Sequence, residues 1–80
     1  MITCEEIYSL HTSKTPESDI HVAYRDIPLD SRNGMRKNDT PLHVACTFAD
    51  EDAVRILLER GADVNVKNND GDTPLCVLAK

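Results

Sequence analysis

The stretch 39-DTPLHVAC-46 is nearly repeated as 72-DTPLCVLA-79. The two copies are 33 residues apart, so Thr40 corresponds to Thr73 and Pro41 corresponds to Pro74. A fixed period of roughly 20 to 50 residues is typical of proteins built from stacked structural units. The repeat therefore predicts an array in which each unit is about as long as this spacing.

The segment after Thr40 has the features of a short helix. Thr40 is a favourable N-cap, and Pro41 stands at the first helical position, where its missing N–H costs nothing. Leu42, Ala45 and Cys46 are spaced i, i+3 and i+4 and would share one helix face. Two of these three side chains are small, so we expect another element to pack closely against this face.

A second helix is expected over residues 51–60. Asp50 can cap it, and the acidic residues of its first turn suit the helix dipole. Gly61 provides a left-handed stop at its C-terminal end. The polar turn at Asp70 and Gly71 then leads to the second DTPL segment. One unit is therefore helix, turn, helix and extended turn, and neither short helix can bury its apolar face alone.

These residues together resemble an ankyrin repeat. The resemblance runs without a gap from Asp39 to Leu75, about half of the chain, and includes TPLH, GADVN and DGDTPL. It implies an all-α, helix-turn-helix solenoid. The residues that carry the structural motif are Thr40, Pro41, Leu42, His43, Gly61, Asp70, Gly71, Thr73, Pro74 and Leu75.

The resemblance also implies roles for single residues. Thr40 and His43 would share a hydrogen-bond network that fixes the start of the first helix, so His43 is structural rather than catalytic or metal-binding. Ala49 stands where the family usually has Gly, and a positive φ there would strain the backbone. Cys76 replaces the expected His in the second copy, which predicts a looser helix start.

The repeat divides the chain into three parts. Residues 39–71 are predicted to be a complete repeat, and residues 72–80 the start of a further, truncated repeat. Residues 1–38 are interpreted as a degenerate ankyrin-like helical unit. The array would then hold about two repeats plus a fragment. An unrelated helical extension is the alternative for residues 1–38.

The N-terminal part shows helix signals of the same kind. Thr3 and Glu6 have the spacing of a capping box, and Thr15-Pro16 is expected to begin a second helix as Thr40-Pro41 does. Four apolar residues then follow the helical spacing i, i+3, i+4, i+7: Ile20, Ala23, Tyr24 and Ile27.

After the last DTPL segment the apolar residues Leu75, Val77 and Leu78 have no following unit to cover them. Because a finished repeat array ends in a polar capping unit, we expect a shortened form of a longer array. The uncovered C-terminal end also suggests self-association.

Net charge and charge distribution argue against nucleic acid and membranes as partners. The net charge is -5, and Arg32, Arg36 and Lys37 form the only loose basic group. A solvated loop is the favoured interpretation of that group. Phosphate binding and anionic membranes both need clustered basic residues.

The three cysteines are widely spaced and form no CxxC or Cys/His pattern. Free thiols and the absence of a secretory signal favour an intracellular, cytoplasmic location, the host cytoplasm if the chain is viral. Cys46 is expected in the core. Cys4 lies near a helix N-terminus, which would lower its pKa, although Glu5 and Glu6 oppose this.

No catalytic, metal or cofactor site is predicted. His11 and His21 have no partner ligand at metal spacing, and the three glycines are isolated, so no phosphate-binding loop exists. We therefore expect a protein that is not an enzyme.

Protein–protein interaction is the function that the resemblance implies. Ankyrin contacts come mostly from turn tips and inner helices, here 33–39, 68–72 and the positions Val44, Thr47 and Phe48, which we expect to be exposed. The residues selected for partner binding are Asn68, Asp70, Asp72 and Phe48. Packing against the neighbouring unit is the favoured alternative for Phe48.

The worn first unit and acidic short chain also resemble ankyrin proteins of poxviruses. That family implies host-range proteins, which often carry a C-terminal F-box-like segment that this sequence lacks. A bacterial effector and a eukaryotic ankyrin fragment remain open as sources. The alternative function is a truncated remnant of a longer ankyrin protein with no independent activity.

Overall fold

The computed structural model describes residues 2–79, which form helices joined by loops. The helices are α1 (Cys4–Thr12), α2 (Glu17–Asp26), α3 (Pro41–Thr47), α4 (Glu51–Glu59) and α5 (Pro74–Ala79). No strand occurs within residues 2–79, where an isolated bridge joins Asn33 to Asp39. The predicted all-α fold is confirmed.

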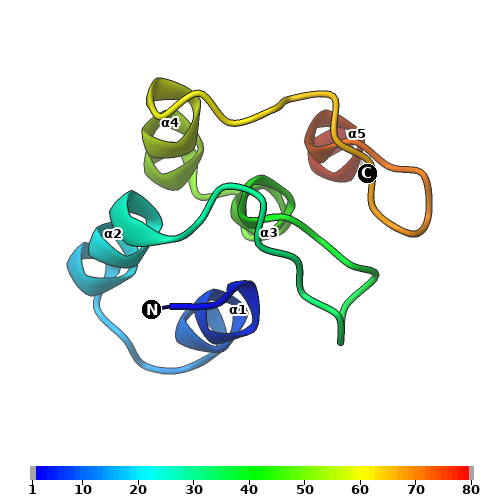
Figure 1. Ribbon diagram of the computed structural model, residues 1–80. Helices are drawn as coiled ribbons and strands as arrows, with labels where there is room; N and C mark the ends of the chain where they lie inside the picture. The colour runs from blue at the N-terminus through cyan, green and yellow to red at the C-terminus, as the bar shows by residue number, and fades with distance from the viewer. Residues whose placement is uncertain (1, 80) are drawn as a thin grey trace.

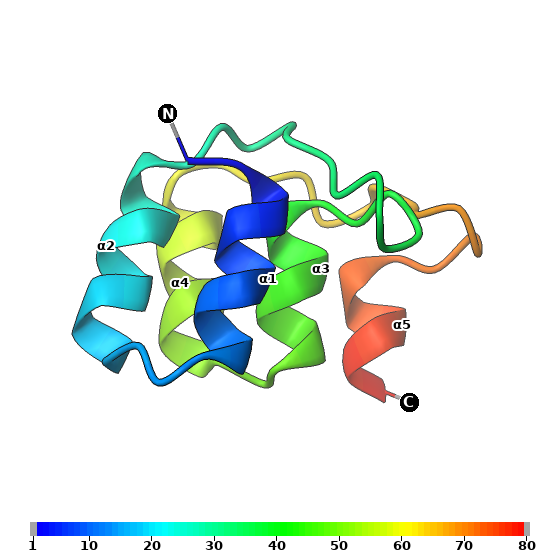
Figure 2. The ribbon, with the colours of Figure 1, turned by 90° about the horizontal axis from the view of Figure 1, so that it is seen from below.

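The helices form two layers (Figures 1 and 2). Helices α1, α3 and α5 lie side by side in the inner layer, and α2 and α4 lie behind them. Each outer helix packs on the inner helix before it, and α2 also packs on α4. Two long loops, residues 27–40 and 60–73, return the chain from the outer to the inner layer and extend from the same end of the helices (Figure 2).

Besides Thr40, the sequence predicts helix caps at Thr3, Thr15 and Asp50, and the structure confirms the first and the last of these. Thr3 accepts the Glu6 N–H at 3.2 Å, and Asp50 accepts the Ala53 N–H at 3.2 Å. The prediction for Thr15 is wrong. Helix α2 begins after Pro16 without a side-chain cap, because the Thr15 hydroxyl hydrogen-bonds to Ser13 instead.

The core lies between the layers and surrounds α3. The apolar residues of α2 and its C-cap that follow the helical spacing are all buried, as that spacing predicts: Ile20, Ala23, Tyr24 and Ile27. Helix α3 is buried on every side from Pro41 to Cys46, not on one face, because α1, α4 and α5 all pack against it. The expected exposure of Val44 is therefore wrong, since that side chain is 1% exposed.

Ala49 has a positive φ of +52°, as its place at a usual Gly position of the repeat suggested. This left-handed conformation is the one in which the Gly of a typical repeat would be unstrained. Asn38 (φ +59°) is also left-handed, as is its neighbour Lys37 (φ +57°), which nothing in the local sequence indicated.

None of the helices within residues 2–79 is both long enough and apolar enough to cross a membrane.

The strain at Ala49 is testable. We expect Ala49→Gly to raise the free energy of unfolding by about 1 kcal/mol, because Gly removes the Cβ that disfavours positive φ. Urea denaturation measures the change. Ala62→Gly is the matched control, since Ala62 has no positive φ, and it should lower stability. A stabilising effect of both variants would contradict the strain.

Candidate protein-binding surface

Each long loop closes on itself through a buried asparagine. The Asn33 N–H donates to the Asp39 carbonyl at 2.8 Å, and the Asn33 side-chain oxygen accepts the Met35 N–H at 3.0 Å. In the second loop, Asn68 donates to the Asp72 carbonyl at 3.0 Å, and its side-chain oxygen accepts two backbone N–H groups. The first loop has more residues between its closing residues, Asn33 and Asp39, than the second loop has between Asn68 and Asp72.

The two loops are also joined to each other. The Asn69 N–H donates to the Lys37 carbonyl at 2.7 Å, and the Asn68 amide donates to the Asp39 carboxylate at 2.9 Å. At the exposed edge, Lys37 forms an ion pair with Asp70 at 2.8 Å, and this hydrogen bond raises the pKa of Lys37. The loops therefore form one cross-linked surface.

The basic residues of the first loop are exposed, as the interpretation of a solvated loop predicts, but each of them also makes a tertiary contact. Arg32 donates to the carbonyls of Asn38 (3.1 Å) and Lys67 (2.9 Å) and bridges the loops. Lys37 has its ion pair with Asp70. The Arg36 guanidinium lies over the Tyr8 ring, 4.2 Å from the ring centroid. Tertiary contacts, which the local sequence does not reveal, determine all three positions.

A buried network fixes the start of α3. The Thr40 hydroxyl lies 2.8 Å from His43 Nδ1, and the Thr40 N–H donates to the same nitrogen at 3.2 Å. On the other side of the ring, Nε2 lies 2.8 Å from the Asp72 carbonyl. His43, with no exposed surface, therefore joins α3 to the second loop.

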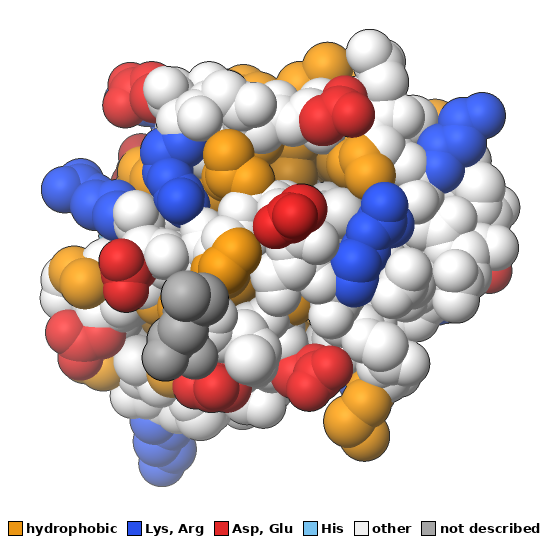
Figure 3. Space-filling view, viewed as in Figure 1, with side chains coloured by type: hydrophobic (Ala, Val, Ile, Leu, Met, Phe, Trp, Pro, Cys, Tyr) orange, Lys and Arg blue, Asp and Glu red, His pale blue; other side chains and the backbone are white. Residues whose placement is uncertain are grey.

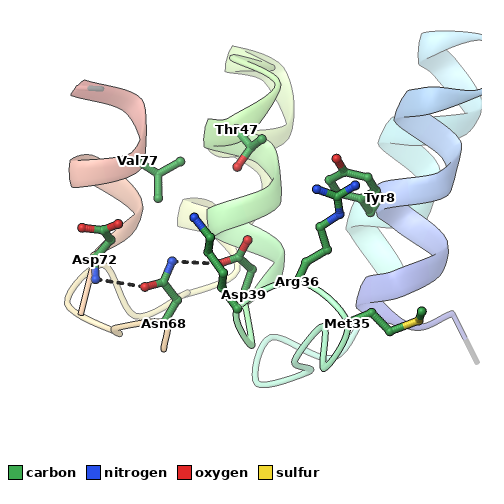
Figure 4. Close-up of a pocket in the computed structure, with 9 residues that line it drawn as sticks. Tyr8, Met35, Arg36, Asp39, Thr47, Asn68, Asp72 and Val77 are labelled. Carbon is green, nitrogen blue, oxygen red and sulfur yellow. Dashed lines mark hydrogen bonds between the residues drawn. The ribbon is translucent and has the colours of Figure 1, made fainter. Parts of the chain in front are cut away.

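An open groove of about 460 Å³ lies between the loops and the inner helices (Figure 4). Side chains from α1, α3, α5 and both loops line it: Tyr8, Met35, Arg36, Lys37, Asp39, Thr47, Asn68, Asp72 and Val77. Two of the residues selected for partner binding, Asn68 and Asp72, are among them. Asp70 lies at the loop tip in its ion pair, and Phe48 lies outside the lining, half-buried.

Comparison with known proteins identifies this arrangement. Residues 37–69 match the family model described as ankyrin repeat. The chain contains an ankyrin repeat. This family is generally a non-enzymatic protein-interaction module, and the repeat here includes α3, α4 and most of the second loop.

Relatives extend the similarity beyond the repeat. The chain is 33% identical over 64 residues to ankyrin repeat-containing protein P1E11.10 of Schizosaccharomyces pombe (80% of this chain, 31% of the relative). It is 32% identical over 71 residues to the ankyrin repeat protein FPV230 of fowlpox virus (89% and 35%). It is 44% identical over 55 residues to mouse ankyrin repeat and SOCS box protein 16 (69% and 12%). The chain thus spans about a third or less of the length of these relatives.

Aromatic side chains connect the groove to the interior beside the ankyrin repeat. The Tyr8 and Phe48 rings meet edge to face with centroids 5.2 Å apart, and Phe48 stacks on His11 at 4.3 Å. His11 Nε2 then lies 2.7 Å from the hydroxyl of the buried Tyr24. Phe48 therefore packs against α1, which in turn contacts α2 through His11 and Tyr24.

The His11 side chain is partly buried. Burial lowers its pKa, and the neighbouring His21 adds to this effect while Asp50 opposes it. His21 itself pairs with Asp50 at 2.9 Å, which joins α2 to the start of α4. The folded chain consequently favours the neutral form of His11.

Two of the three cysteines, Cys4 and Cys46, have buried thiols. Burial raises the pKa of the Cys4 thiol to about 12, and the negative charges of Asp39 and Glu5 add to this effect. The prediction of a lowered pKa is therefore wrong, because the Cys4 side chain is buried in the core although its neighbours Thr3 and Glu5 are exposed. Burial also raises the pKa of Cys46, which lies in the core as expected. Among residues 2–79, no group of three or more His, Cys, Asp or Glu side chains is placed to hold a metal ion.

A second, smaller groove lies between α4 and α5 and is almost entirely apolar. Figure 3 shows hydrophobic side chains gathered in this region of the face that carries the loops. Leu75 and Leu78 of α5 are 71% and 51% exposed there. The lining residues are Leu42, Cys46, Val54, Leu58, Val64, Pro74, Leu75 and Leu78.

The hydrogen-bond network around His43 predicts that removal of the Thr40 hydroxyl lowers the stability of the fold. Thr40→Val keeps the side-chain shape but removes the hydroxyl, and we expect it to cost about 1 to 3 kcal/mol, because a buried ring nitrogen loses a partner. Thr73→Val is the matched control: its hydroxyl caps the exposed α5 start at 3.3 Å, so the loss should be smaller. Urea denaturation measures the free energy of unfolding of both variants. Equal decreases in the two variants would contradict the role of the network.

The environment of His11 predicts a pH dependence of stability. Because its pKa is lowered in the folded chain, its contribution is fully present above the ordinary pKa of about 6.5. That contribution is lost as the pH falls through the lower pKa of the folded state. We expect His11→Gln, which can still hydrogen-bond to Tyr24 but does not titrate, to flatten the dependence of unfolding free energy on pH. Parallel curves for the two proteins would contradict this.

Proposed function

We propose that the chain binds a partner protein through the groove between its two loops and the inner helices. The observation that supports this most is the cross-linking of the loops. They hold an open, mixed polar and apolar groove at the surface through backbone hydrogen bonds and the Lys37–Asp70 pair. A rigid surface loses little conformational entropy when a partner docks.

Membership of the ankyrin family supports the same proposal, since its repeats generally act as interaction modules. Four residues were selected from the sequence for contact. Asp70 and Asp72 are accessible to a partner at the loop, whereas Asn68 (8% exposed) contributes by holding the loop shape. Phe48 contributes by supporting Tyr8 from behind.

Residues 1–38 are, we infer, a diverged repeat that completes the groove. In support, α1 and α2 occupy the two layers in the same order as α3 and α4 (Figure 2), and Asn33 matches Asn68 in closing its loop. The alignment with the fowlpox protein, 71 residues long, also extends well to the N-terminal side of residues 37–69. On this view, residues 72–80 begin the next unit.

A viral host-interaction role is the narrower form of the proposal. Its support is the similarity to the fowlpox virus protein. Under this role the partner is a host protein and the chain acts in the host cytoplasm, which suits the free thiols of Cys4, Cys46 and Cys76.

Affinity capture from cell lysate tests the proposal. We expect the wild-type chain to enrich specific proteins, and Thr47→Arg or Val77→Arg to abolish the enrichment, because both side chains line the groove. Glu59→Arg on the outer layer is the control and should retain it. Capture of chaperones only, or equal capture by all variants, would contradict groove binding and support the remnant without independent activity.

The apolar groove between α4 and α5 is proposed as a self-association surface. The exposure of Leu75 and Leu78 supports this, since contiguous exposed apolar side chains favour burial against another molecule. We expect sedimentation velocity to show a concentration-dependent oligomer that Leu78→Glu dissociates. A monomer at all concentrations would contradict it.

A further inference from the structure

We propose that the partner segment that occupies the groove carries an acidic side chain, Asp or Glu, and that its carboxylate is bound by Arg36. This inference rests on the proposed function and names the chemistry of the partner. The chemistry follows from how Arg36 is held and from which charges in the groove are already used.

Arg36 is held with its hydrogen-bond donors unused. Its guanidinium lies 4.2 Å from the centroid of the Tyr8 ring, at the α1 end of the groove (Figure 4). Within residues 2–79 this guanidinium makes no hydrogen bond or ion pair. Stacking on a ring occupies the face of a guanidinium and leaves the N–H groups at its edge for a ligand. A carboxylate matches two of these donors at once.

The ring beneath Arg36 is fixed from behind. Tyr8 meets Phe48 edge to face at 5.2 Å, and Phe48 stacks on His11 at 4.3 Å. Tyr8 therefore cannot turn without moving a half-buried aromatic pair. A guanidinium on a fixed ring loses less freedom when it binds than one at the end of a mobile side chain. The Tyr8 hydroxyl, which has no hydrogen-bond partner within residues 2–79, adds a donor beside it.

The other charged side chains of the groove are already partnered. Lys37, the second basic residue in the lining, is paired with Asp70 at 2.8 Å. The Asp39 carboxylate accepts the Asn68 amide at 2.9 Å. Arg36 is thus the cation of the lining, as described in residues 2–79, whose charge is not balanced by a neighbour.

A single carboxylate suits this groove better than a polyanion. Asp39 and Asp72 line the same groove, and the net charge of the chain is -5. A phosphate backbone would need several clustered cations to offset that repulsion. One acidic side chain can reach Arg36 while its neighbours in the segment contact the polar and apolar wall at Thr47 and Val77.

Selection of short random peptides displayed on phage, with the 80-residue chain as target, tests the inference. We expect the selected peptides to be enriched in Asp and Glu. Fluorescence anisotropy with a selected synthetic peptide should show about tenfold or greater weakening when its acidic residue is changed to the amide. In Arg36→Gln the acidic and amide peptides should bind equally. Arg55→Gln, on α4 of the outer layer, is the matched control and should keep the difference.

Two further results separate the inference from the proposed function. Peptides that lose binding with Thr47→Arg but bind equally in acidic and amide forms would overturn the carboxylate site and leave groove binding intact. A selection that yields no peptide would overturn both. Circular dichroism melts of Arg36→Gln verify that the variant folds, and Tyr8→Leu, which removes the ring beneath Arg36, should weaken the acidic peptide as well.

Discussion

One buried imidazole holds the array together. His43 receives the Thr40 N–H at 3.2 Å on one side and meets the Asp72 carbonyl at 2.8 Å on the other. A buried polar group without partners costs more than a made hydrogen bond gains, so the ring has to be satisfied at both nitrogens. This requirement determines the start of α3 and the position of the second loop at once. The groove depends on both.

Hydrogen bonds within and between the two loops add to the contacts that His43 makes. Buried Asn33 and Asn68 close the two loops in the same way, and Arg32 joins the first loop to the second. Since both loops lie at the surface, their backbone groups would otherwise be solvated and the loops mobile. Cross-linking turns two flexible connections into one wall of the groove, beside the inner helices.

Local sequence predicted the parts of the molecule that depend on local chemistry. The 33-residue period and the caps at Thr40 and Asp50 could be recognised from short segments, whereas the left-handed turn at Ala49 was suggested only by the resemblance to the ankyrin family. The burial of Val44 and the raised pKa of Cys4 could not, because each depends on which element packs alongside. The same holds for Arg36 and Tyr8, which are far apart in sequence and meet only when α1 packs beside α3. The loop closures by Asn33 and Asn68 were also hard to recognise in the sequence. The two loops differ in length, so these residues are not separated by the 33-residue period.

Backbone carbonyls accept several of the hydrogen bonds that hold the loops. The carbonyls of Lys37 and Lys67 accept between the loops, that of Asn38 accepts within the first loop, and that of Asp72 faces His43 of α3. Because every residue type supplies a carbonyl, the hydrogen bonds to Asn38 and Lys67 do not depend on the side chains at those two positions. Positions 35, 47 and 77 likewise present side chains toward solvent or the groove without holding the loops. The chain thus separates the residues that build its frame from those that face outward, and a library randomised at the outward positions could change specificity while the frame stays the same.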